Sequence, residues 1–134
     1  MLRRDYMLNE ARKLAALIAK LLGLKAEGKY AEYSQLLNDT LQKEYDTEAA
    51  ILVDLSEEDF KTKIAAADYS PEKLNALSQL LYMFAQPFKA DEETKTLLNK
   101  VLAIFDLLEQ KHAYQSFENL DKQKIIYQYF KNNE

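Results

Sequence analysis

The only histidine of the chain, His112, stands in a Glu109-x-x-His112 spacing on a predicted helix. Glu-x-x-His is half of the ligand set that di-iron carboxylate bundles use, and such a site needs a second copy of the motif. Since the chain has 1 His, the second copy cannot exist within it. We therefore interpret Glu109 and His112 as a solvated helix end, where His112 and Lys111 favour the negative end of the helix dipole.

Two acidic clusters, Glu57–Asp59 and Asp91–Glu93, are the other candidates for chemistry. Paired carboxylates can serve glycoside hydrolysis or hold Mg²⁺. Both clusters begin predicted helices, where carboxylates stabilise exposed backbone amides and the positive end of the dipole. We therefore favour a structural role for both clusters.

Other reactive arrangements have no residues to form them. The chain has no Cys, which excludes disulfides and thiolate catalysis, and it has no Gly-x-Ser-x-Gly turn to present a nucleophile to the lone histidine. Gly23 and Gly28 are the only glycines, so neither glycine-rich phosphate-binding motif is possible. The sequence predicts no catalytic residue, no metal site and no cofactor.

Residue counts indicate which elements must position these side chains. The chain holds 22 Leu and 16 Ala against 2 Val, 6 Ile and 5 Thr, and only 2 Gly and 2 Pro. Helix formers therefore outnumber the β-branched residues that strands favour, and turn residues are too few for a sheet of short strands. We predict an all-α fold of antiparallel helical hairpins with bundle-like packing.

Length and charge limit the class of protein further. A chain of 134 residues predicts a single domain, 1–134, with one core. With 48% hydrophobic and 30% charged residues, it is too apolar for disorder and too often interrupted by charge for a membrane span. A net charge of −4 repels polyphosphate, so we expect no nucleic-acid partner. We expect a cytoplasmic location.

Apolar residues recur at spacings of three and four along most of the chain, which predicts about five main helices and one or two short ones. Thr47, Ser56 and Asp121 are expected to cap helices, and Ser70 followed by Pro71 is the clearest start signal. The main helices are expected near 5–26, 29–45, 71 to just before Pro87, 91–112 and from 121 onward, with short helices near 49–55 and after Ser56.

The segment 24–37, which contains Gly28, Tyr30 and Tyr33, resembles the turn and second helix of a tetratricopeptide repeat. This resemblance implies one hairpin with packing of that type, and no second copy of the pattern follows 34 residues after Gly28. The start of the chain, Met1 to Tyr6, with the amphipathic helix and Gly-x-Tyr that follow, is similar to a bacterial family of small all-helical proteins of unknown function. The similarity implies a fold and a bacterial origin, and no activity.

The chain has 9 Tyr and no Trp, and tyrosine is common at protein interfaces. Tyr30, Tyr33, Tyr129 and Ile125 fall on the apolar stripes and are expected in the core, whereas Tyr82 and Tyr127 fall off them. We therefore expect Tyr82 and Tyr127 to be exposed and to contact a protein partner.

These observations favour a non-enzymatic protein-protein interaction or scaffold module, with self-association as one possibility. One alternative is a small-ligand-binding protein or enzyme with a pocket between helices. Another is peripheral membrane association through the first helix, which carries the basic residues Arg3, Arg4, Arg12, Lys13 and Lys20. The apolar face of that helix is expected to pack on the second helix, which makes membrane association the least favoured of the three.

Overall fold

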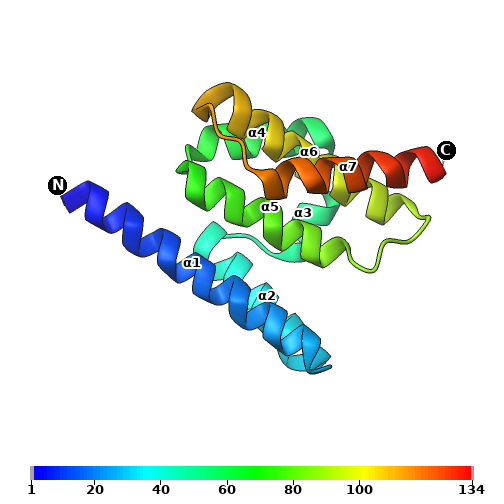
Figure 1. The fold of residues 1–134 in the computed structure, drawn as a ribbon, viewed down its shortest axis with the longest axis horizontal. Coiled ribbons are helices and arrows are strands. Elements are labelled where there is room, and N and C mark those ends of the chain that lie inside the picture. The colour runs from blue at the N-terminus through cyan, green and yellow to red at the C-terminus, as the bar shows by residue number, and fades with distance from the viewer. Residues whose placement is uncertain (1, 134) are drawn as a thin grey trace. The chain divides into compact units, whose positions relative to one another are not determined.

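The computed structural model describes the backbone of residues 2–133 and the side chains of residues 9–133 (Figure 1). Within this part of the chain all regular structure is helical, which confirms the all-α class. The helices fall into two compact units, one ending at Leu55 and one beginning at Ser56. The helices are α1 (Leu2–Ala26), α2 (Tyr30–Tyr45), α3 (Ala49–Asp54), α4 (Glu57–Ala67), α5 (Pro71–Ala85), α6 (Glu92–His112) and α7 (Phe117–Asn132).

In the first unit, α1 and α2 form the predicted antiparallel hairpin (Figure 1). Gly28 makes the turn at φ +73°, a conformation in which any other residue would be strained. At the far end of the hairpin, the Lys13 ammonium lies 2.7 Å from the Glu44 carboxylate. Leu21 and Leu41 are fully buried. The apolar stripe of each of the two helices therefore contains a fully buried residue.

Two expectations for this unit are wrong. Tyr30 is exposed, because α1 ends at Ala26 and leaves little helix surface beside the first turn of α2. Thr47 does not cap α3: the N-cap residue is Glu48, which makes no side-chain capping bond, and the Thr47 hydroxyl donates to the Glu48 carbonyl at 3.5 Å. Tyr33 is buried as expected.

In the second unit, α5 and α6 form the other predicted hairpin, and α4 and α7 pack against α6 (Figure 1). Leu77, Leu81, Leu98 and Leu108 are almost completely buried. Burial of one such side chain stabilises a fold by about 1.5 to 3 kcal/mol. The α5–α6 pair therefore supplies most of the core of this unit.

Side-chain caps fix where the helices of the second unit begin. The hydroxyl oxygen of Ser56, the hydroxyl oxygen of Ser70 and the carboxylate of Asp91 each accept a hydrogen bond from a backbone amide three residues later, at 3.0, 3.2 and 2.8 Å. The acidic residues at 57–59 and 92–93 lie in the first turns of α4 and α6. These placements are the structural roles predicted for both clusters.

The expected cap of the last helix is wrong. The helix begins four residues before Asp121, because the Ser116 hydroxyl oxygen accepts a hydrogen bond from the Asn119 amide at 3.1 Å. Asp121 therefore lies on the surface of α7 rather than at its start. Phe117 and Leu120, which we placed in the link before this helix, belong to its first turn.

Replacing the Ser70 cap tests how much α5 depends on it. Ser70→Ala removes the oxygen that accepts from the Lys73 amide, and loss of such a cap costs about 1 kcal/mol. Urea unfolding should show this loss of stability. Ser70→Asp keeps an acceptor oxygen and should stay close to wild type; equal stability of all three proteins would contradict the assigned cap.

The Asp91 cap predicts a pH dependence of stability. Hydrogen bonds from the Thr94 backbone amide and hydroxyl lower the pKa of the Asp91 carboxyl below its ordinary value, with smaller contributions from Lys89 and Lys95. A carboxylate with a lowered pKa in the folded state stabilises the fold above its unfolded pKa, and this contribution is lost as pH falls through the folded pKa. The melting temperature should therefore be higher for wild type than for Asp91→Asn at neutral pH. This difference should disappear at about pH 2, and a constant difference would contradict the assignment.

Candidate functional site

The inner face of α7 is held against α5 and the α5–α6 loop by two specific hydrogen bonds. The Asn119 side-chain amide donates to the Asn75 side-chain oxygen at 2.8 Å, and the Tyr129 hydroxyl donates to the Lys89 carbonyl. Ile126, between them on the helix, is fully buried. Burial raises the pKa of the Tyr129 hydroxyl, and the carboxylates at 91 and 92 add to the shift. These contacts fix the rotation of α7 about its axis.

Tyr82 lies under this helix, which contradicts its expected exposure. Its side chain is only 8% exposed, its ring packs edge-on against Phe88 at 5.3 Å between centroids, and the Lys122 ammonium lies 5.2 Å from the ring centroid. Burial raises the pKa of Tyr82, with a smaller contribution from Asp121, and burial lowers the pKa of Lys122. The spacing of apolar residues predicts one buried stripe on α5. Most of the circumference of α5 is buried, so Tyr82 is buried although it lies off that stripe.

The outer face of α7 carries exposed aromatic, aliphatic and basic side chains. Five residues at alternating spacings of three and four lie along it, and all are exposed. The exposed fractions of Phe117 and Tyr127 are 92% and 58%. Tyr127 is thus exposed as expected, whereas Ile125, which we expected to be buried, is exposed as well. We call the five residues the α7 seam: Phe117, Leu120, Lys124, Tyr127 and Lys131.

A hollow of about 240 Å³ adjoins the first turn of this seam. It is lined by Gln115, Ser116, Phe117 and Leu120. The hollow therefore offers a recess for an apolar side chain beside the most exposed phenylalanine of the described side chains.

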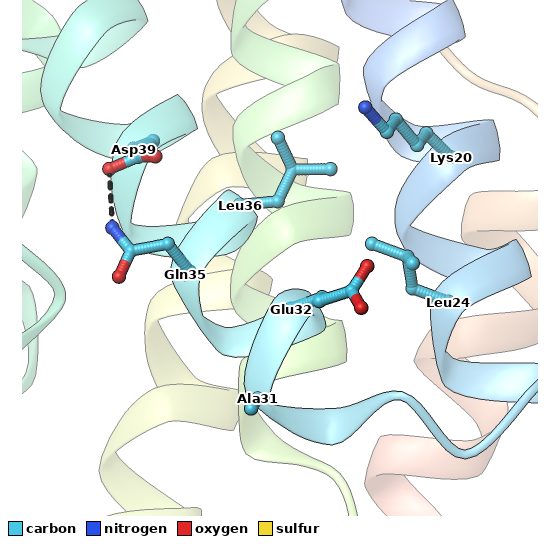
Figure 2. A pocket seen from close by; sticks show the side chains of 7 residues that line it. All are labelled: Lys20, Leu24, Ala31, Glu32, Gln35, Leu36 and Asp39. Carbon is cyan, nitrogen blue, oxygen red and sulfur yellow. Dashed lines mark hydrogen bonds between the residues drawn. The ribbon is translucent and has the colours of Figure 1, made fainter.

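A second hollow lies on the α1–α2 hairpin and has a volume of about 360 Å³ (Figure 2). Leu24 and Leu36 form its apolar part, and Lys20, Glu32 and Asp39 are charged residues around it. On the α2 side, Gln35 donates to Asp39 at 2.9 Å (Figure 2). Each lining residue is exposed or half-buried. The hollow is thus a surface groove, whereas small-molecule sites bury most of the ligand surface.

His112 departs from the solvated helix end that we expected. Its side chain is half-buried, and its Nε2 atom is enclosed and has no hydrogen-bond partner among the described residues. The cause is helical phase: His112 lies one turn after Leu108 on the buried face of α6. Glu109 is exposed as expected.

Lys100 is a buried cation that sequence reasoning missed. Its side chain is 0% exposed, and its ammonium lies 5.9 Å from the Phe60 ring centroid. Lysine is rarely buried. The only sequence signal for the burial of Lys100 is that its neighbours on α6 are also buried. In its contact with Phe60 it joins α6 to α4.

The described part of the chain contains no cluster of three His, Asp or Glu side chains able to hold a metal ion. None of the helices in residues 2–133 combines the length and the apolar character needed to cross a bilayer.

Comparisons with known proteins give no relative: no family model, no curated protein and no solved structure matches this chain.

The α7 seam brings Tyr127 together with residues that sequence reasoning missed. Phe117, Leu120, Lys124 and Lys131 were not candidates, because we placed the helix start at Asp121. The alternating spacing of three and four through positions 117–131 is the signal that could have found them. Tyr82 and Tyr127 are not brought together, because one lies under α7 and the other on its outer face.

The anchoring of α7 by Tyr129 can be tested with a matched pair of substitutions. Tyr129→Phe removes the hydroxyl that donates to the Lys89 carbonyl and leaves a partly buried acceptor without its partner, at a cost of about 1 kcal/mol. Tyr127→Phe makes the same change on the exposed face and should leave stability unchanged. Chemical denaturation measures the free energy of unfolding of both variants, and equal losses of stability would contradict the assigned anchoring.

Proposed function

We propose that this chain is a non-enzymatic protein-interaction module and that the outer face of α7 contacts its partner. The observation that carries this proposal is the exposure of Phe117, at 92%, on the same face as Leu120 and Tyr127. Large aromatic side chains are enriched at the centres of protein interfaces, where each can contribute 2 kcal/mol or more, by order of magnitude. Tyr127 remains a proposed contact residue.

The placement of the groups that could do chemistry supports a non-enzymatic role. The acidic residues at 57–59 and 92–93 lie in exposed first turns, where they stabilise helix ends. The enclosed Nε2 atom of His112 is poorly placed to exchange protons with a substrate. The open form of the α1–α2 groove favours a peptide segment over a small molecule as its occupant.

The proposal also includes the expected family resemblance and cellular location. The antiparallel α1–α2 hairpin, with its turn at Gly28, supports a resemblance to one hairpin of a tetratricopeptide repeat. A bacterial origin and a cytoplasmic location remain part of the proposal.

Affinity capture from the native host tests the proposed function. The tagged wild-type chain should retain a specific protein, and the double variant Phe117→Ser/Tyr127→Ser should lose it, because each truncated aromatic contact costs about 2 kcal/mol. Both positions are exposed, so circular dichroism and the melting temperature should match those of wild type.

Leu22→Ser is the matched control, because Leu22 is an exposed leucine of α1 outside the seam. This variant should capture the same protein as wild type. Equal capture by wild type and the double variant, or no specific capture at all, would contradict the proposal.

A further inference from the structure

The α7 seam has the spacing of a helix-pairing surface. Phe117, Leu120, Lys124, Tyr127 and Lys131 follow one another at steps of three, four, three and four residues. These steps are those of the a and d positions of a heptad, which face a second helix in a coiled coil. Phe117, Lys124 and Lys131 occupy one set of positions, and Leu120 and Tyr127 occupy the other.

No other described part of its compact unit covers this surface. The opposite side of α7 is held inward by Asn119, Ile126 and Tyr129, so the helix cannot turn the seam toward the core without breaking those contacts. All five seam residues are exposed. The helix therefore presents a preformed surface, and a partner does not have to order it first.

The charge of the seam is positive in an acidic protein. The whole chain carries a net charge of −4, yet the charged residues of the seam are Lys124 and Lys131. Neither ammonium forms an ion pair with a carboxylate of the described residues. Lysines at such central positions specify which partner can pair, because an opposing charge must meet them.

We propose that the α7 seam docks an acidic amphipathic helix of a different protein. In this arrangement apolar side chains of the partner pack on Phe117, Leu120 and Tyr127, and its carboxylates face Lys124 and Lys131. One apolar side chain enters the hollow that Gln115 and Phe117 help to line. This inference rests on the proposed interaction function and specifies the chemistry of the partner.

The same pattern disfavours two other occupants. A second copy of the chain would use the same surface on both sides, so parallel pairing would place Lys124 against its own copy, and no pairing of two seams supplies a carboxylate. In a membrane-bound helix the cations flank the apolar face, whereas here Lys124 lies between Leu120 and Tyr127. Insertion of the apolar side chains would therefore carry an ammonium into the bilayer.

Two synthetic helical peptides of about three heptads test the inference directly. The acidic peptide carries leucines to face the apolar seam residues and glutamates to face the two lysines, and the basic peptide has lysines in place of those glutamates. Fluorescence anisotropy should show that the wild-type chain binds the acidic peptide about tenfold more tightly than the basic one. The variant Lys124→Glu/Lys131→Glu should reverse this preference.

The control variant Arg12→Glu/Lys43→Glu changes the net charge by the same amount at exposed positions of α1 and α2. It should keep the preference of wild type, and an equal change in both double variants would mean that net charge alone governs binding and would overturn the inference. Absence of any preference in wild type would overturn it as well.

Two further experiments test the other two occupants of the α7 seam, a membrane surface and a second copy of the chain. A positive result in either experiment would overturn the inference. Flotation with phosphatidylserine vesicles that is lost in Lys124→Glu/Lys131→Glu would assign the seam to a membrane surface. A dimer in light scattering that Phe117→Ser dissociates would assign it to a second copy. If native capture depends on Phe117 and Tyr127 but not on the two lysines, the interaction function stands and the acidic partner is wrong.

Discussion

The attachment of α7 by its inner face is the constraint on which the functional interpretation depends. The Asn119 amide reaches Asn75 on α5, and the Tyr129 hydroxyl reaches the Lys89 carbonyl in the α5–α6 loop. Unlike apolar packing, which tolerates small rotations, these two bonds are directional, and breaking either leaves a partly buried polar group without its partner. They set the rotation of the helix, and the rotation determines that Phe117 and Tyr127 face outward.

The rest of the second unit serves to make that attachment rigid. Its α5–α6 hairpin buries seven of its nine leucines, and the caps at Ser70 and Asp91 fix where both helices begin. Phe88 packs edge-on against Tyr129 at 5.8 Å between ring centroids, so an aromatic side chain also holds the loop that α7 contacts. An interface built on such a support loses little conformational entropy on binding, which favours recognition by a fixed helix surface.

Most of the fold could be predicted from the sequence, because helix period and capping are local signals. Ser70 with Pro71, and the acidic residues from Asp91, mark helix starts through the chemistry of unpaired backbone amides, and both were correct. The start of α7 was missed because Asp121 and Ser116 are both good capping residues, and tertiary contacts decide between them. Burial of Lys100 was missed for a similar reason, because it depends on what packs around α6.

Hydroxyl-radical footprinting of the free chain and of the complex tests the central claim most directly. The account predicts that Phe117 and Tyr127 oxidise much faster than Tyr129 and Tyr82 in the free protein. In the complex, both should become protected while Tyr30, which is exposed on α2, stays reactive. Slow oxidation of Phe117 in the free chain, or full reactivity of Phe117 and Tyr127 in the complex, would contradict it.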